Sequence, residues 1–248
     1  MEINNKNVSV GTENASAKDA TPVIPSVNAG KIILDLCGGT GSWSNPYAES
    51  SYDVHIITLP NYDMFEVVCN SDTKMLEFTN HSTGAVECIN ASEVYGILAA
   101  PMCTQFSLAR TTAKTPRDLA GGMALVKKCL EVIWFCREQP DSKLKFWALE
   151  NPVGYLRQFL GIPPLTFDPY DYGDTYTKRT DIWGYYKIPK KLRTAATASE
   201  DEKPVSFDRH PLPQLPDDYV MPKGWNRKAA RRSMTSTYFA KAFYKANK

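Results

Sequence analysis

A cysteine and a glutamate stand directly after two apolar runs of the chain, at positions where side chains can do chemistry. Cys103 follows the run VYGILAAP (94–101), while Glu150 and Asn151 come directly at the end of the run KFWALE (145–150). A thiolate is a nucleophile and a carboxyl group can give or take a proton, so the pair suits covalent catalysis. The alternatives are a packed core thiol at Cys103 and a solvated turn at Glu150.

A glycine-rich turn supplies a third candidate feature, in the stretch LDLCGGTGSW (34–43). Glycines at the end of a strand let backbone N–H groups approach a ligand at the carboxyl edge of a sheet. The dinucleotide-binding fingerprint fits poorly, because Trp43 and Ser44 stand where its third glycine is expected. Asp35 points instead to a pocket of the S-adenosylmethionine type, and a tight turn that binds nothing is the alternative.

The order of predicted strands and helices around these residues predicts an α/β fold. Apolar runs predict strands at 31–36, 52–59, 94–101 and 145–150, with short strands and turns over 64–90 and a hairpin over 166–186. A helix is expected to open at Thr115–Pro116, with a core-facing stripe of Leu119, Met123, Val126, Leu130 and Trp134. Strands alternating with helices predict a mostly parallel sheet covered on both faces.

Composition narrows the functional classes. The 248 residues are 43% hydrophobic and carry a net charge of +2, so total charge gives no argument for nucleic-acid binding. Six cysteines without CxxC pairs and three histidines indicate neither a metal site nor a disulfide framework. No signal peptide or membrane span is visible, so we expect a cytoplasmic protein, with a disordered tail over 1–29.

Four segments in this order resemble the cytosine carbon-5 DNA methyltransferases. They are the glycine loop (Asp35, Leu36, Cys37, Gly38, Gly39, Thr40 and Gly41), Pro101–Met102–Cys103, Glu150–Asn151–Pro152, and Thr177–Lys178–Arg179–Thr180–Asp181. The resemblance implies a Rossmann-like methyltransferase fold with a catalytic core over 30–186. Residues 187–232 would be a reduced target-recognition or irregular segment, and 233–248 a closing helix like that of small phage-type cytosine methylases.

The resemblance also implies roles for single residues. Cys103 would add to carbon 6 of cytosine while Glu150 donates to ring nitrogen 3, Asn151 would position the Glu150 loop, and Arg179 would hold the base carbonyl and lower the pKa of the thiol. The glycine loop would bind S-adenosylmethionine together with Thr58, Pro101 and Thr235. The implied partner is DNA, duplex or single-stranded, with no metal, membrane or protein partner.

Several positions depart from the family pattern. Met102 replaces the usual proline, Thr177 and Asp181 replace the glutamine and second arginine of the last motif, and Cys37 replaces a phenylalanine. Thr58 stands where an acid normally binds the ribose, with Asp63 as the nearest candidate. These changes, and the short 187–232 segment, keep open a nucleic-acid-binding relative without catalysis and an enzyme acting on a free pyrimidine nucleotide.

Overall fold

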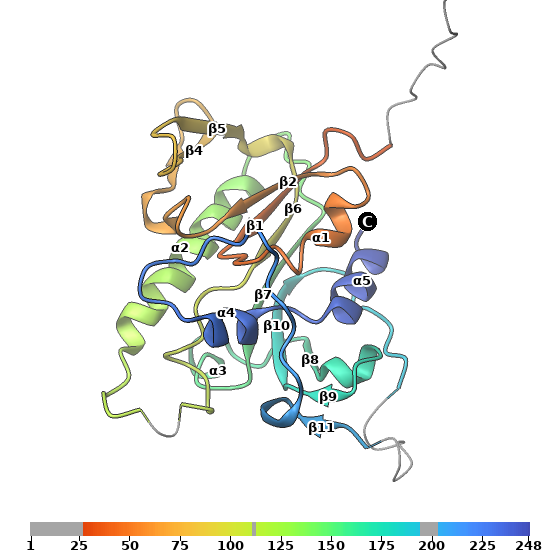
Figure 1. Ribbon diagram of the computed structural model, residues 1–248. Coiled ribbons are helices and arrows are strands. Elements are labelled where there is room, and N and C mark those ends of the chain that lie inside the picture. Colours follow the sequence, from red (N-terminus) through yellow and green to blue (C-terminus); the bar gives the residue numbers. More distant parts are fainter. Residues whose placement is uncertain (1–26, 111–112, 194–202) are drawn as a thin grey trace, which may run out of the picture.

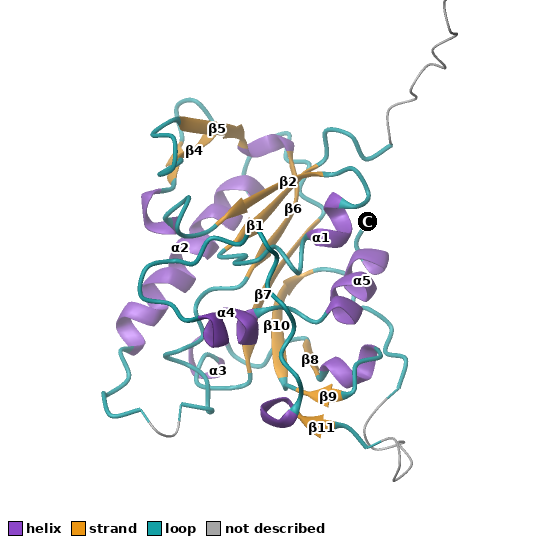
Figure 2. Cartoon of the chain, in the orientation of Figure 1, coloured by secondary structure: helices purple, strands orange, loops and turns teal. Residues whose placement is uncertain are grey.

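The computed structural model describes residues 27–110, 113–193 and 203–248, and it shows an α/β protein built on a mixed six-stranded sheet (Figures 1 and 2). The strand order is β2-β1-β6-β7-β10-β8. The strands are β1 Ile32–Leu36, β2 Asp53–Ile57, β6 Val94–Ala99, β7 Phe146–Pro152, β8 Leu165–Phe167 and β10 Thr180–Tyr185. The expected α/β class is confirmed.

The prediction of a mostly parallel sheet is wrong for its second half. β2, β1, β6 and β7 are joined by parallel pairings, but β10 runs antiparallel to both β7 and β8. A parallel neighbour needs a long crossover, usually a helix. Between β8 and β10 the chain has only a 3-10 turn, Pro169–Tyr172, and the two-residue strand β9, Tyr176–Thr177, so it returns as an antiparallel pair.

Helices cover both faces of the sheet, because successive strand residues point to opposite sides. Leu34 and Leu36 face a core that includes buried residues of α2, Leu119–Arg137. Ile33 faces the other core, which contains Phe239 and Phe243 of α5, Thr237–Ala246. The short helix α1, Asn45–Ala48, lies on the α5 side (Figure 1).

Helix α2 begins later than the sequence pattern indicates. Its N-cap is Asp118, whose side chain accepts a hydrogen bond of 2.8 Å from the Gly121 N–H, and not Thr115. The predicted stripe is also wrong at its end, because Trp134 is 56% exposed. The buried face is formed by Val126, Cys129, Val132, Ile133 and Cys136. The predicted stripe steps by four residues at its end, which exceeds the 3.6-residue period of a helix, so Trp134 lies away from the buried face.

Two smaller units complete the fold. The predicted short strands over 64–90 are present as an antiparallel sheet of β3 Val68–Asn70, β4 Met75–Thr79 and β5 Val86–Asn90. After the main sheet, β11 Val205–Ser206 pairs with β9, and the chain continues to α4, Arg227–Ser233, and α5. Segment 203–235 passes over the middle of the molecule in the view of Figure 1.

Two further expectations concern the ends of the chain and the membrane. Of the tail predicted over 1–29, residues 1–26 lie outside the described residues, and 27–30 form a turn in which the Asn28 amide donates 3.0 Å to the Ser50 carbonyl. No helix in the described part of the chain has the length and apolar character needed to cross a bilayer.

Candidate active site

A cavity of about 930 Å³ runs along the edge of the main sheet where β1, β2, β6 and β7 end and β10 begins. Ligands of α/β sheets bind at this edge. Of the residues predicted for the site, the cavity is lined by Asp35, Cys37, Gly38, Gly39, Thr58, Pro101, Cys103, Glu150, Arg179 and Thr235. The four predicted segments therefore meet at one cavity, although Leu36, Thr40, Gly41 and Asn151 do not line it.

The turn after β1 needs glycine at two points. A Cβ atom on Gly38 would lie 2.3 Å from the carboxyl carbon of Asp35, and Gly39 has a φ of +56°. The Gly39 N–H donates 3.3 Å to Thr58 Oγ1, which joins the turn to the end of β2. Backbone at this turn thus approaches the cavity closely, as a cofactor-binding loop requires.

Three loop residues lie outside the cavity, and two of them, Leu36 and Gly41, are needed by the fold. Leu36 belongs to the core beneath α2, and a Cβ on Gly41, whose φ is +69°, would lie 2.5 Å from Ile56 Cδ1. The hydroxyl of Thr40 is buried and has no hydrogen-bond partner among the described residues.

Asp35 is a fully buried acid that borders the cavity. Its Oδ2 accepts a hydrogen bond of 2.6 Å from Ser44 Oγ, while its Oδ1 has no partner within the described residues. Burial raises the pKa of this carboxyl to about 7, against a smaller lowering by Ser44. Among the residues that the structure describes, Asp35 Oδ1 is therefore an unused hydrogen-bond acceptor, and a cation placed in the cavity would stabilise the charged form of Asp35.

The Cys103 thiol is half-buried and lines the cavity, in a loop that the structure fixes at several points. The Cys103 carbonyl accepts hydrogen bonds of 2.9 Å from the N–H groups of Phe106 and Ser107, which closes a tight turn. The fully buried Asn151 donates 3.0 Å from its side-chain amide to the Pro101 carbonyl. This bond joins the strand end that carries Glu150 to the loop that carries Cys103.

Arg117 is a second anchor of this loop, and sequence reasoning missed it. Its guanidinium donates to the carbonyls of Gln105 and Ser107 at 2.8 and 2.9 Å and lies 4.8 Å from the centroid of the Tyr155 ring. The Tyr155 N–H in turn donates 2.9 Å to the Phe106 carbonyl. No motif marks Arg117, because its partners are backbone carbonyls that only the folded loop brings together.

The Cys103 and Glu150 side chains share one electrostatic environment. Burial raises the pKa of Cys103, with a further rise from the Glu150 charge and smaller lowering by Lys178 and Arg232. Burial also raises the pKa of Glu150, which the Lys178 ammonium lowers and Asp181 raises. The free protein therefore holds a protonated thiol beside a carboxyl group with an increased tendency to keep its proton.

The expected lowering of the thiol pKa by Arg179 is wrong. The net shift is upward, and the two cations that oppose it are Lys178 and Arg232. Arg179 is exposed at the cavity wall, and its charge acts on Asp168, whose pKa burial raises and Arg179 partly lowers. Lys178 lies inside the matched motif without an implied role, and no motif in the sequence places Arg232 near Cys103.

Thr58 and Thr235 both lie on the cavity wall, on the glycine-turn side. Thr58 accepts the hydrogen bond from Gly39 described above. The Thr235 N–H, just before α5, donates 2.8 Å to Ser42 Oγ in the segment after the glycine turn. The start of the closing helix is therefore tied to the predicted cofactor loop.

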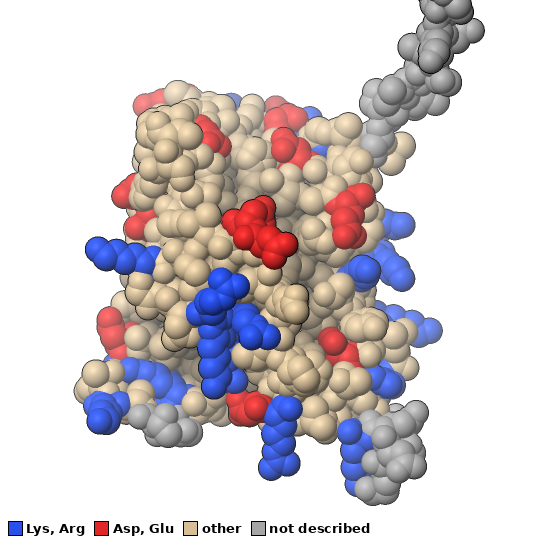
Figure 3. All heavy atoms as spheres, viewed as in Figure 1, with Lys and Arg blue, Asp and Glu red and all other residues tan. Residues whose placement is uncertain are grey.

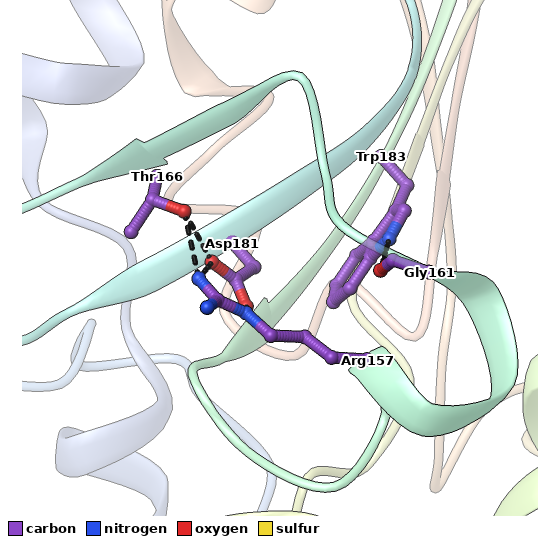
Figure 4. A network of polar contacts seen from close by, with 5 residues as sticks. All are labelled: Arg157, Gly161, Thr166, Asp181 and Trp183. Carbon is purple, nitrogen blue, oxygen red and sulfur yellow. Dashed lines mark hydrogen bonds and ion pairs between the residues drawn. The ribbon is translucent and has the colours of Figure 1, made fainter.

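Asp181 is a structural residue, which accounts for one departure from the family pattern. It is fully buried, and Arg157 donates to its two carboxylate oxygens from Nε and Nη2, both at 2.6 Å, while Thr166 Oγ1 donates at 2.7 Å (Figure 4). In the same view Trp183 Nε1 donates 3.0 Å to the Gly161 carbonyl. Both contacts hold α3, Arg157–Leu160, and the residues after it against β10.

Comparison of the sequence with protein-family models gives no match, and comparison with curated proteins gives none either. The chemistry of this chain is therefore inferred from the cavity and its residues.

Proposed function

We propose that the protein is an S-adenosylmethionine-dependent methyltransferase with a Rossmann-like core, which methylates carbon 5 of cytosine in DNA. One observation carries the proposal: the order of charged and reactive groups along the sheet edge. Asp63 and Asp35 belong to the β2 and β1 end, Cys103 and Glu150 to the middle, and the cations Lys178 and Arg179 to the β10 end. Acidic side chains at one end of the cavity suit a cationic methyl donor, and the cationic side chains at the other end suit an anionic nucleic acid as the methyl acceptor.

The acidic end fits the donor. S-adenosylmethionine carries a sulfonium and an ammonium group, and Asp35 offers a buried oxygen that has no partner within the described residues. Backbone at Gly38 and Gly39 lines the same end of the cavity, together with Asp63, whose Oδ1 accepts 2.9 Å from the Phe65 N–H. Asp63 would take the ribose hydroxyls in place of Thr58. When bound, the donor would supply an electrophilic methyl group.

The middle of the cavity fits the acceptor. Cys103 would release its proton to solvent water and form a bond from Sγ to carbon 6 of cytosine. Glu150 would give a proton to nitrogen 3, so that the ring electrons become available at carbon 5. After methylation, a water molecule would take the carbon-5 proton, the carbon 5–carbon 6 double bond would form again, and Cys103 would leave as a thiolate as the bond from Sγ to carbon 6 breaks. Nitrogen 3 then returns its proton to Glu150. The raised pKa of Glu150 supports its role as the proton donor.

Two observations favour other functions. The raised pKa of Cys103 fits a relative that binds nucleic acid without catalysis, because a thiol is a poor nucleophile. Segment 203–235 lines a large part of the cavity, which fits a free pyrimidine nucleotide as substrate.

The test is covalent trapping on an oligonucleotide that contains 5-fluorocytosine, in the presence of S-adenosylmethionine. A fluorine at carbon 5 cannot leave as a proton, so we expect a stable adduct on Cys103, detected by mass spectrometry of the intact protein and its peptides. Cys103→Ala should abolish the adduct, and Cys88→Ala, an exposed cysteine of β5, should leave it unchanged. If no adduct forms while the oligonucleotide still binds, the result would favour the nucleic-acid-binding relative without catalysis. If methyl groups are transferred to dCTP but not to the oligonucleotide, it would favour the enzyme that acts on a free nucleotide.

A further inference from the structure

We infer that the DNA accepted by this site is single-stranded, held by stacking on Trp225 and by the cations at the start of α4. The inference rests on the proposed function and narrows its substrate class. Its first basis is the position of segment 203–235. Within the described residues this segment packs against the sheet edge and lines the cavity with Phe207, Tyr219, Trp225 and Arg232.

The cover formed by this segment is too slight to read a duplex. Its regular elements are the two-residue strand β11, a 3-10 turn at Phe207–Arg209 and the seven-residue helix α4. Its buried apolar residues before α5 are Phe207, Leu215, Pro222 and Ala230. Duplex recognition places a helix or strand ribbon in a groove and holds the second strand while the target base leaves the stack. Nothing in 203–235 has the size for both tasks.

The cavity wall instead carries aromatic groups suited to an unpaired base. Trp225 and Tyr219 are both half-buried and line the cavity. Phe207 is less available for stacking on a base, because the Lys178 ammonium and the Arg232 guanidinium each lie 5.0 Å from its ring centroid. Stacking of bases on aromatic side chains, beside a cationic track for the backbone, is the mode by which proteins hold single strands.

Two cations of α4 make contacts that stabilise the fold, and the other two are exposed. The Arg231 guanidinium donates 2.6 Å to the Pro213 carbonyl and also bonds the Leu212 carbonyl, and Arg232 pairs with Asp208 at 2.7 Å. Arg227 and Lys228 are exposed and take part in none of the ion pairs found among the described residues. They would meet the phosphates of a strand whose base enters the cavity.

Figure 3 shows the surface on which this strand would lie. Lys and Arg side chains gather over α4, and acidic side chains form a separate cluster beside them. The acidic cluster would repel a polyanion, so it leaves a narrow basic track at α4 and not a broad basic face. A single strand fits such a track better than the two phosphate backbones of a duplex.

The test is binding, measured by fluorescence anisotropy with a labelled 12-nucleotide DNA that contains one cytosine, used single-stranded, as a duplex and as its RNA counterpart. We expect the DNA strand to bind at least tenfold more tightly than the duplex at equal salt. Trp225→Ala should weaken that binding about tenfold and Trp225→Phe should largely restore it. The matched control is Trp134→Ala, on the exposed face of α2. Equal binding of duplex and strand, tighter binding of RNA, or wild-type affinity in Trp225→Ala would overturn the inference.

The phosphate contacts have a separate readout. Log affinity falls as log salt concentration rises, and the double variant Arg227→Gln/Lys228→Gln should make this dependence less steep. The magnitude of the slope should decrease by about 1.4, at roughly 0.7 for each lost phosphate contact with a single strand. Lys241→Gln/Lys245→Gln on α5 is the matched control and should leave the slope unchanged. An unchanged slope in the α4 variant would remove Arg227 and Lys228 from the inferred surface.

Failure of this inference and failure of the proposed function give different results. Cys103→Ala removes the nucleophile but not the stacking surface, so it should bind the strand with wild-type affinity. A Cys103 adduct together with duplex preference would overturn the single-strand inference alone. Strand binding through Trp225 without any adduct would overturn the methyl-transfer proposal alone.

Discussion

The side-chain amide of Asn151, near the end of β7, donates a hydrogen bond of 3.0 Å to the carbonyl of Pro101 in the loop after β6. Asn151 is adjacent to Glu150, and Pro101 stands two residues before Cys103. Both bonded residues are buried, so water does not compete for the bond. This one contact therefore fixes the loop of the nucleophile against the strand of the carboxyl group.

Asn151→Ala should lower both stability and reactivity. The Pro101 carbonyl would be left buried without its donor, which costs about 1–3 kcal/mol in the free energy of unfolding. Urea unfolding measures the loss, and the rate of 5-fluorocytosine trapping at Cys103 should fall in the same variant. Asn45→Ala, which removes an exposed bond to Glu49, should change stability by less than about 0.5 kcal/mol. Equal losses in the two variants would contradict a positioning role for Asn151.

The reactivity of Cys103 should respond in opposite directions to its two charged neighbours. Lys178 lowers the pKa of the thiol and Glu150 raises it. At pH 8, Lys178→Met should therefore slow alkylation of Cys103 by iodoacetamide, and Glu150→Gln should accelerate it, since only the thiolate reacts. Peptide mass spectrometry separates Cys103 from the other five cysteines. Lys241→Met, on the exposed side of α5, is the control, and changes of the same sign in both test variants would refute this arrangement of charges.

Asp35 should make the protein less stable as the pH rises towards neutrality. Its pKa lies near 7 in the folded state against an ordinary value of 3.8, so the native protein keeps a proton that the unfolded chain has lost. The free energy of unfolding should therefore fall between about pH 4 and pH 7, by up to about 1.4 kcal/mol per pH unit from this group. Urea midpoints at pH 5, 6, 7 and 8 should show a shallower fall in Asp35→Asn.

The control for that titration is Asp72→Asn, in the exposed turn between β3 and β4, which should keep the wild-type pH slope. An Asp35→Asn variant with the same slope as the wild type would mean that Asp35 is charged throughout this range.

The parts of the site that sequence could predict are those fixed by strand ends. The glycine turn follows β1, Cys103 follows β6, and Glu150 lies near the end of β7. The carboxyl ends of parallel strands lie at one edge of the sheet. Local patterns along the chain therefore suffice to bring them to one cavity. The α/β class follows from the same apolar runs.

The parts that sequence could not predict depend on tertiary contacts. Lys178 and Arg232 are 54 residues apart in the sequence, and segment 203–235 brings them together where it lies over the cavity. The Lys178 ammonium there donates 2.9 Å to the Arg232 carbonyl. Arg117 likewise binds two carbonyls that no motif announces. At α2, the sequence pattern indicates a start at Thr115–Pro116, but the helix begins three residues later, where the Asp118 side chain accepts from the Gly121 N–H.

The ion pair between Arg157 and Asp181 should contribute to stability far more than an exposed pair. Asp181 is fully buried, so Arg157→Ala would leave its charge without a cation and should lower the free energy of unfolding by about 3–5 kcal/mol. The double variant Arg157→Met/Asp181→Leu removes both charges and should lose much less, because apolar side chains of similar size need no counter-charge. Lys143→Ala, which breaks an exposed pair with Glu93, should cost about 1 kcal/mol or less. Guanidinium unfolding of the three variants separates these cases, and a loss in Arg157→Ala no larger than in Lys143→Ala would show that this pair does not hold α3 to β10.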